Sequence, residues 1–374
     1  MKLDEFIKFN PKESLSKGKC FKCVDMASLK PFTRKPDHFI SIYKNGSKFR
    51  NGDTIMARIT PCLENGKTSY INFLQQNEVA FGSTEFIVAR AKTNVSLPLF
   101  IYYLLCSNRI REIAIGSMTG SSGRERVQQI SLNEIEIPAY SISFQQHIVD
   151  TIGSIDDLIE KNEDIITNAR SLINAFYDTI IVEMGNSILK DFFVITIGRT
   201  PPTKESKWFS SSSRGNVKWL SIKDMAQNST YIFETSQFLT NDALKKFNIP
   251  IVKEGDVLLS FKLTVGRTAI AGANMVTNEA IACFKANPEY RNYLFCYLQR
   301  CNFLSDGDNT SSIGKAVNST IIKNFPFVIP SKGSLDTFNK KTHSLFELIK
   351  LKQKENITLK MQKTTLLCKY FPSI

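Results

Sequence analysis

Apolar residues along the middle of the chain recur in alternating steps of four and three between positions 148 and 180. This spacing is the a/d pattern of a coiled-coil helix, and Asn162 is its one polar interruption. It predicts a long helix from Ser141 to Glu183 whose seam requires a partner helix. The seam positions are Ile148, Ile152, Ile155, Ile159, Asn162, Ile166, Ala169, Ile173, Phe176 and Ile180.

A second, poorer seam lies 190 residues further along, in a predicted helix from Leu335 to Phe371. Its positions are Phe338, Thr342, Leu345, Ile349, Lys352, Asn356, Leu359, Lys363, Leu366 and Tyr370. Residues 142–183 carry eight acidic and two basic side chains, whereas residues 335–374 carry eight lysines and three acidic side chains. Opposite charges favour pairing of the two helices with each other, antiparallel within one molecule. The alternative is a helix that packs only on its own domain.

An internal repeat precedes each predicted helix. The segment GSSGRERVQQISLNEIEIP (120–138) resembles TSSIGKAVNSTIIKNFPFVIP (310–330), so that the serine pair of the first recurs in the second. Upstream, Gly52-Asp53 recurs as Gly255-Asp256, each pair opening a run typical of a β-strand. A repeat of this length predicts two similar domains.

Within each half the pattern predicts mixed α/β structure, with strands bounded by Gly-Asp, Asn-Gly and Pro signals. The expected strands lie in residues 49–60, 67–74, 78–91, 218–225, 255–263 and 267–286, and short helices in 97–114 and 290–304. The predicted fold class is α+β: two similar mixed α/β domains separated by two long helices that pair as an antiparallel coiled coil. The expected boundaries are 1–140 for the first domain, 141–184 for the central helix, 185–332 for the second domain and 333–374 for the C-terminal helix.

Composition narrows the class of protein. A chain of 374 residues with 42% apolar content can bury two ordinary cores without disulfides or metal. Its eight cysteines show no framework of paired spacings, which favours free thiols in a reducing compartment. No apolar run is long enough to cross a bilayer, and the N-terminus is charged. We therefore expect a soluble, cytoplasmic protein without a membrane partner.

The net charge of +13 is shared by both domains. Residues 1–141 contain 20 basic and 13 acidic side chains, and residues 184–334 contain 18 and 11. Two equally basic domains indicate a polyanion as their common ligand, because neutralising phosphates supplies much of the affinity for nucleic acid. The alternative is that excess lysine reflects an A·T-rich genome.

Several segments together resemble type I restriction–modification specificity subunits. They are GSKFRNGDTIMARITPCLENGKTSYI with AFGSTEFIVAR, the serine-glycine loop before an Ile-Pro pair, FQQHIVDTIGSIDDLIEKNE, and IGRTPPTKES with NVKWLSIKDM. The resemblance covers essentially the whole chain in the family's order: target-recognition domain, spacer helix, second target-recognition domain, second helix. One departure is the first domain's opening MKLDEFIKFNPKES, where members often carry a preamble similar to IGRTPPTKES. The first domain is therefore expected to read a different type of half-site.

This resemblance implies a non-catalytic subunit that binds an asymmetric, bipartite sequence in double-stranded DNA, one domain per half-site. The implied partners are two methyltransferase subunits and the restriction–translocase subunits. No cofactor is expected on this chain, because S-adenosylmethionine, ATP and Mg would be bound by the partners. The alternative is a non-catalytic coiled-coil assembly scaffold that binds RNA or acidic proteins without reading bases.

Motifs for catalysis and metal binding are not found in the sequence. It lacks a glycine-rich phosphate loop, a glycine motif of the S-adenosylmethionine type and the Asn-Pro-Pro-aromatic signature of amino methylation. Cys20 and Cys23 form half of a zinc site, but no second pair follows and His38 stands alone. His147 and His343 are expected on helix surfaces, so we expect neither catalytic residues nor metal ligands.

Candidate DNA contacts fall in two groups. The serine-glycine loops 120–126 and 310–315 contain small residues whose backbone amides can approach phosphates, although a helix-capping turn would explain them equally. Other polar side chains suit base edges and phosphates, although an ordinary solvated surface would suit them equally. Trp208 is expected in an exposed loop, or alternatively in a small satellite cluster. The candidates are Arg58, Glu64, Asn65, Lys67, Ser121, Ser122, Arg124 and Arg126 in the first domain, and Lys204, Trp208, Lys218, Lys223, Lys262, Arg267, Ser311, Ser312 and Lys315 in the second.

Overall fold

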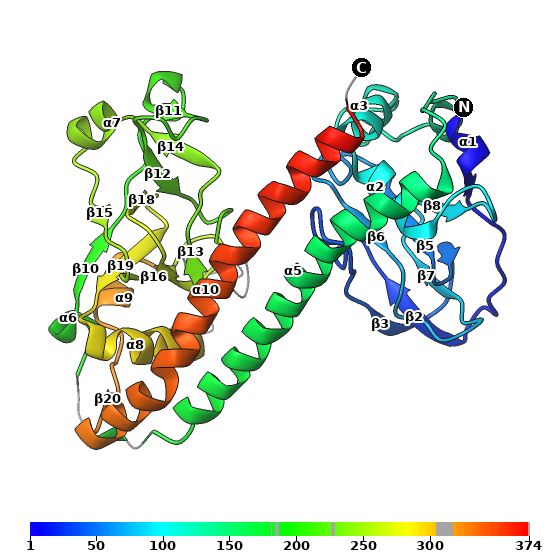
Figure 1. Cartoon of the computed structure of the whole chain (residues 1–374). Coiled ribbons are helices and arrows are strands. Elements are labelled where there is room, and N and C mark those ends of the chain that lie inside the picture. The colour runs from blue at the N-terminus through cyan, green and yellow to red at the C-terminus, as the bar shows by residue number, and fades with distance from the viewer. Residues whose placement is uncertain (181, 184–186, 226–228, 304–316, 373–374) are drawn as a thin grey trace. The chain divides into compact units, whose positions relative to one another are not determined.

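The computed structural model describes residues 1–180, 182–183, 187–225, 229–303 and 317–372. It divides into two compact units (Figure 1). The first unit contains Met1–Glu160 and Ile357–Ile374, and the second contains Lys161–Asn356. Each unit therefore includes part of both long helices, α5 (Ile142–Tyr177) and α10 (Lys332–Tyr370).

Two sheets, one antiparallel and one mixed, form the body of the first unit. One has the order β1-β8-β5-β6 and the other β3-β2-β7-β4. All pairs are antiparallel except β2 with β7. The strands are β1 (Ile7–Phe9), β2 (Cys20–Val24), β3 (Phe39–Ile42), β4 (Ser47–Phe49), β5 (Asp53–Ala57), β6 (Thr68–Tyr70), β7 (Ala80–Gly82) and β8 (Phe86–Ala91). The helices are α1 (Leu3–Phe6), α2 (Pro98–Cys106), α3 (Asn108–Gly116) and α4 (Gln129–Asn133).

The second unit repeats this topology with one additional strand in each sheet. Its sheets have the orders β10-β19-β16-β17-β13 and β11-β14-β12-β18-β15. The strands are β10 (Val194–Ile197), β11 (Phe209–Ser210), β12 (Val217–Leu220), β13 (Tyr231–Ile232), β14 (Gln237–Leu239), β15 (Ile251–Val252), β16 (Val257–Ser260), β17 (Thr268–Ala271), β18 (Met275–Thr277) and β19 (Ile281–Lys285). The helices are α6 (Leu189–Phe192), η1 (Ser206–Trp208), α7 (Asn241–Lys246), α8 (Pro288–Arg300) and α9 (Ser319–Lys323), and β9 (Val182–Glu183) pairs with β20 (Ile329–Pro330).

Corresponding strands show that the two units share one scaffold. The sheet order β1-β8-β5-β6 matches β10-β19-β16-β17, and β3-β2-β7-β4 matches β14-β12-β18-β15. The single parallel pair of the first unit, β2 with β7, corresponds to β12 with β18. The prediction of two similar mixed α/β domains is confirmed.

The repeated Gly-Asp pair is explained by one turn. The Asp53 carboxylate accepts a hydrogen bond from the Arg50 N–H at 2.7 Å, and Asp256 accepts one from the Lys253 N–H at 2.8 Å. The glycine before each aspartate has a φ near +90°, a conformation that most L-residues avoid. The same local chemistry therefore starts β5 and β16 in equivalent positions.

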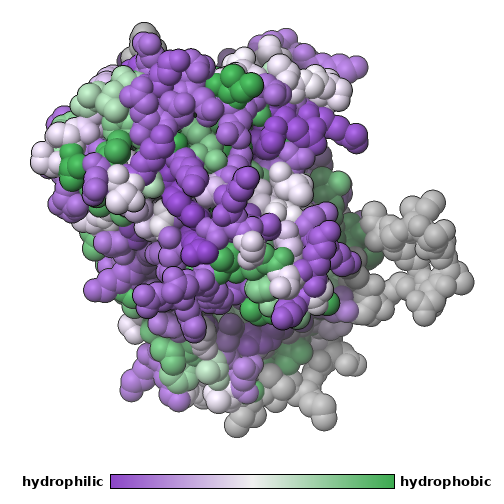
Figure 2. Space-filling model, turned by 90° about the vertical axis from the view of Figure 1, so that its right-hand side faces the viewer, coloured by the Kyte–Doolittle hydropathy of each residue, from purple (hydrophilic) through white to green (hydrophobic). Residues whose placement is uncertain are grey.

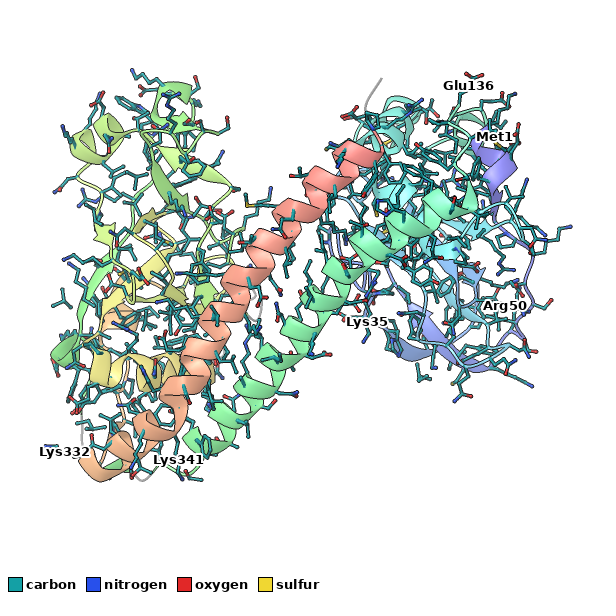
Figure 3. The ribbon with its side chains drawn as sticks, in the orientation of Figure 1. Met1, Lys35, Arg50, Glu136, Lys332 and Lys341 are labelled. Atoms are coloured by element: carbon teal, nitrogen blue, oxygen red, sulfur yellow. The ribbon has the colours of Figure 1, made fainter. Side chains whose placement is uncertain are left out.

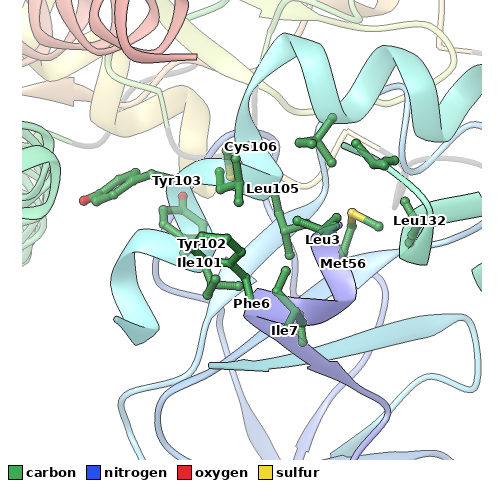
Figure 4. Packing of buried hydrophobic residues seen from close by; sticks show 14 of the residues in the cluster. Leu3, Phe6, Ile7, Met56, Ile101, Tyr102, Tyr103, Leu105, Cys106 and Leu132 are labelled. Atoms are coloured by element: carbon green, nitrogen blue, oxygen red, sulfur yellow. The ribbon is translucent and has the colours of Figure 1, made fainter. Parts of the chain in front are cut away.

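The core of the first unit joins the N-terminal segment to the helices. Leu3 and Phe6 pack with Met56 of β5, Tyr102 of α2 and Leu132 of α4, as Figure 4 shows in part. Side chains from both long helices complete this core, so their ends are part of the domain rather than appendages. They are Ile148 and Ile152 of α5 and Leu366, Leu367 and Tyr370 of α10, and Phe371, which directly follows α10, belongs to the same core.

The prediction of a single helix over residues 97–114 is wrong. The structure divides this stretch into α2 and α3 at Ser107, whose Oγ accepts a hydrogen bond from the Ile110 N–H at 3.4 Å. A serine side chain that caps a new helix start stabilises the break. The central helix also ends earlier than expected, at Tyr177, because Val182–Glu183 pairs with Ile329–Pro330.

The two long helices pair antiparallel in each unit, as predicted. In the first unit the Lys363 ammonium lies 2.7 Å from the Asp156 carboxylate, and Tyr370 Oη lies 3.0 Å from His147 Nε2. In the second unit Asn162 donates to Asn356 at 2.9 Å. As residue numbers rise along α5, the numbers of their partners on α10 fall, as expected for two antiparallel helices. Both seams are buried or half-buried along the described positions.

We predict that Lys363→Ala lowers the free energy of unfolding by about 3–5 kcal/mol, because it leaves the buried Asp156 carboxylate without its counter-charge. The exposed Lys369 on the same helix provides the matched control. Lys369→Ala should change stability by less than about 0.5 kcal/mol. Urea unfolding measures both, and equal effects of the two substitutions would contradict the role assigned to the buried pair.

Candidate nucleic-acid interface

The candidates in the first domain converge from two segments. Residues 58–67 follow β5, and residues 119–126 connect α3 to α4. The Thr60 N–H donates to the Glu125 carbonyl at 3.0 Å, and the Val127 N–H donates to the Arg58 carbonyl at 2.8 Å. Backbone pairing thus brings segments distant in sequence into one surface, which we call the first loop surface.

Exposed side chains on the first loop surface supply the chemistry for reading DNA. Exposed Glu64 and Asn65 can pair with base edges, and exposed Arg124 can neutralise a phosphate. The Arg111 guanidinium donates to the Glu64 carbonyl at 3.0 Å and so fixes the turn that carries Glu64 and Asn65. Ser121 and Ser122, both exposed, lie in the 119–126 segment beside Arg124.

Arg126 has a different environment from Arg124. Its guanidinium forms an ion pair with the Glu85 carboxylate, with the closest atoms 2.8 Å apart. The hydrogen bond from Arg126 lowers the pKa of Glu85. Arg58 donates to the Val127 carbonyl at 3.3 Å. Both arginines therefore hold the loop in position, and Arg124 is the more available cation.

Lys67 and Arg267 hold corresponding positions in the two domains, each directly before β6 or β17. Lys67 Nζ donates to the Met26 carbonyl at 2.7 Å, and Arg267 Nη1 donates to the Met225 carbonyl at 2.7 Å. The accepting segments follow β2 and β12, which belong to the other sheet of each domain. These cations connect the two sheets, so both side chains are engaged within their own domain.

In the second domain, the connection between β16 and β17 corresponds to residues 58–67. Lys262 is exposed there, and Leu263 is 95% exposed with a φ of +62°. Sequence reasoning missed Leu263, because its apolar character was interpreted as a continuation of the strand. The strand ends at Ser260, whose hydroxyl donates to the Thr264 carbonyl at 2.5 Å and closes a turn. This turn projects a cation and an apolar side chain together.

The remaining candidates of the second domain differ in availability. Lys204 and Lys223 are exposed. Lys218 Nζ donates to the Phe233 carbonyl at 2.6 Å and forms an ion pair with Glu234, so it is partly committed within the domain. Ser311, Ser312 and Lys315 lie outside the described residues.

The expectation that Trp208 lies in an exposed loop is wrong. Its side chain is 8% exposed and packs with Trp219, Leu239 and Ile249 in a satellite cluster. The indole N–H donates to Glu205 at 3.1 Å. A ring whose apolar faces are covered by its own domain cannot stack on a base without unfolding that cluster.

Metal chemistry finds no support among the described residues, where no three His, Cys, Asp or Glu side chains gather as metal ligands. His38 stacks on Phe73 with ring centroids 4.0 Å apart, which occupies its ring face. Among the residues that the structure describes, no helix combines the length and the apolar character that a membrane span requires.

The face drawn in Figure 2 is largely hydrophilic, with small apolar patches between the polar side chains.

A family model described as the type I restriction modification DNA specificity domain matches residues 1–169 and 181–361. The chain belongs to this family. The two matched regions correspond to the two copies of the scaffold, and the resemblance inferred from the sequence motifs is confirmed.

Curated relatives share the family at low identity. The chain is 21% identical to the type I restriction enzyme MjaVIII specificity subunit of Methanocaldococcus jannaschii over 73% of this chain and 69% of that protein. It is 29% identical to the EcoAI specificity subunit of Escherichia coli over 33% of this chain. That alignment spans a fifth of the Escherichia coli protein.

A solved structure has the same fold. The type I restriction–modification S subunit from M. genitalium aligns with a TM-score of 0.52 and 15% identity. The alignment covers 100% of this chain and 96% of that one. Two copies of a mixed α/β domain with two long helices are thus an arrangement found in a solved specificity subunit.

We predict that Glu85→Gln lowers the free energy of unfolding at pH 7 by up to about 1 kcal/mol, because the ion pair with Arg126 is partly exposed. The pKa of Glu85 is lowered in the folded state, so its contribution is present above the ordinary glutamate pKa. It is lost as the pH falls through the lowered value. Urea unfolding of the unaltered chain and of the Glu85→Gln variant should show that the difference in their free energies of unfolding shrinks as the pH falls. A difference that does not change with pH would contradict this assignment.

Proposed function

We propose that this chain is the sequence-specific DNA-reading subunit of a type I restriction–modification complex, with residues 1–140 reading one half-site and residues 185–332 the other. The observation that carries this is one scaffold, present twice, that offers different side chains at equivalent positions. Residues 58–67 present Glu64 and Asn65, whereas the equivalent turn presents Lys262 and Leu263.

Different side chains at equivalent positions favour an asymmetric target. An asparagine reads adenine through two hydrogen bonds, and a carboxylate accepts from cytosine. A lysine prefers guanine or a phosphate, and an apolar side chain contacts the thymine methyl group or wedges between base steps. Because the two turns carry different groups, each domain should read its own short sequence.

The candidate residues of the two DNA-reading surfaces are proposed in two roles, contact with DNA and positioning of the contacting loops. Glu64, Asn65, Ser121, Ser122, Arg124, Lys204, Lys223, Lys262 and Leu263 touch bases or phosphates. Arg58, Lys67, Arg126, Trp208, Lys218 and Arg267 position the surfaces that do so. Ser311, Ser312 and Lys315 are proposed as contacts on the sequence repeat alone, since they align with the loop that contains Ser121 and Ser122.

The assembly is proposed from family membership. The paired helices α5 and α10 form the spacer on which two methyltransferase subunits and the restriction subunits dock. S-adenosylmethionine, ATP and Mg are bound by those partners, and this chain is non-catalytic. Since restriction and methylation both act on DNA inside the cell, the site of action is the cytoplasm.

Selection of bound duplexes from a random pool tests this function. The proposal expects enrichment of two different short motifs at a fixed spacing. The second candidate, a scaffold for RNA or acidic proteins, is favoured only by the basic charge of the domains. That candidate expects binding without enrichment of any base sequence, and such a result would overturn the proposal.

We predict that Lys262→Ala reduces the slope of log affinity against log salt by about 0.9 if Lys262 neutralises one phosphate. Lys67→Ala removes the bond to the Met26 carbonyl instead, so it should lower the free energy of unfolding and leave the salt slope unchanged. Anisotropy titrations over a range of salt, together with urea unfolding, separate the two roles. A loss of slope in the Lys67 variant would contradict the positioning role.

A further inference from the structure

The first domain has an apolar strand at the edge of a sheet. Strand β3 is the terminal strand in the order β3-β2-β7-β4. Ile40 and Ile42 in this strand are 64% and 53% exposed, and Phe39 is also exposed. In the register with β2, Ile40 lies opposite Lys22 and Ile42 opposite Cys20, so both isoleucines share one face. Exposed, apolar edge strands are sites at which another strand can add.

Backbone geometry makes this edge available for pairing. The Tyr43 N–H donates to the Lys19 carbonyl at 2.9 Å, which marks Tyr43 as bonded toward β2. Alternate residues of an antiparallel strand bond to opposite neighbours, so Ser41 and Phe39 also bond toward β2. Ile40 and Ile42 therefore present their N–H and C=O groups, as well as their side chains, at the open edge.

The second domain covers the equivalent edge with its own chain. Strand β14 corresponds to β3, and β11 pairs with it antiparallel through Phe209↔Leu239 and Ser210↔Phe238. The register against β12 places Phe238 opposite Lys218, just as Ile40 lies opposite Lys22. Phe238 is 8% exposed.

The difference between the domains comes from the length of one connection. Residues 198–216 join β10 to β12 and contain β11, whereas the shorter stretch of residues 10–19 joins β1 to β2 and contains no strand. The first domain is therefore built on the same scaffold without the segment that closes this edge.

Charge around the edge defines the chemistry of a partner. Lys19 and Lys44 are exposed at the end of the pair where β2 begins and β3 ends. Lys35 is exposed in the connection that leads into β3 (Figure 3 labels Lys35). Asp37, also near the strand, forms an ion pair with Lys30 at 2.9 Å. A second copy of the chain would bring the same lysines to the interface, which disfavours self-pairing. An acidic partner strand would complement them.

We propose that β3 is a docking site for an extended, acidic segment of a partner protein, which adds antiparallel to β3 as β11 adds to β14. Main-chain hydrogen bonds to Ile40 and Ile42 would supply affinity, and contacts with their side chains would supply preference for alternating apolar residues. This surface belongs to the β3-β2-β7-β4 sheet, so the inference does not depend on the DNA-reading role of the loops after β5.

The test uses the full chain and a fluorescent ten-residue peptide with acidic ends and alternating valine and threonine between them. Anisotropy should show saturable binding that weakens with salt. The double variant Ile40→Ser, Ile42→Ser should weaken binding by about tenfold or more, because it removes the apolar contact without changing the charge of the interface. Ile130→Ser, at a similarly exposed apolar side chain on helix α4, should leave binding within about twofold.

Two control peptides separate strand addition from charge attraction. Replacing the central valine with N-methylvaline removes a backbone donor and should abolish binding, whereas reversing the acidic ends to lysine should weaken it strongly. No saturable binding, or equal binding by the N-methylated peptide or by the double variant, overturns the proposal.

A second variant closes the edge within the molecule. Residues 10–19 are replaced by residues 198–216, and the variant should lose peptide binding while its unfolding remains cooperative. If the unaltered chain forms a dimer and the isoleucine variant does not, a second copy of the chain is the occupant, and the proposal is overturned. Loss of duplex selection in the isoleucine variant would assign β3 to the DNA interface and would also overturn it. Failure of the unaltered chain to select DNA motifs, with its peptide binding intact, would instead contradict only the proposed DNA-reading function.

Discussion

Pairing of the two long helices constrains the rest of the structure, and two polar pairs set its register. Lys363 is buried against Asp156 in the first unit, and Asn162 is buried against Asn356 in the second. A buried ammonium without its carboxylate is costly, so any slip of one helix along the other would be penalised at these points. Since each unit includes part of both helices, the pairing also connects the first domain's core to the C-terminal end of the chain.

One scaffold with two sets of loops links the fold to function. The Gly-Asp turns start β5 and β16 alike, and Lys67 and Arg267 hold the same two sheets together in each domain. The turns that follow those strands carry different side chains, Glu64 and Asn65 in one copy and Lys262 and Leu263 in the other. A protein that must distinguish two half-sites can keep the stabilising contacts constant and vary only the exposed side chains.

Periodicity and repetition predicted the helices, their pairing and the duplicated domains, because these features are recorded in local spacing along the chain. The break at Ser107 was not predictable from apolar character, since apolar residues continue from the buried helix α2 into the amphipathic helix α3 across the capping serine. The tethering roles of Lys67 and Arg267 depend on carbonyl groups about forty residues away in sequence, which no local pattern reveals. Trp208 is buried by strands that come later in the chain, and Leu263 is exposed because the strand ends at Ser260.

The central claim is that each copy of the scaffold reads its own half-site. The most direct measurement is duplex selection by a chimera in which residues 1–140 are replaced by residues 185–332, so that both domains carry the same loops. The account predicts a target with dyad symmetry that contains the second domain's half-site twice. An asymmetric target that still contains the first half-site would contradict it, because the motif would then be read outside the replaced domain.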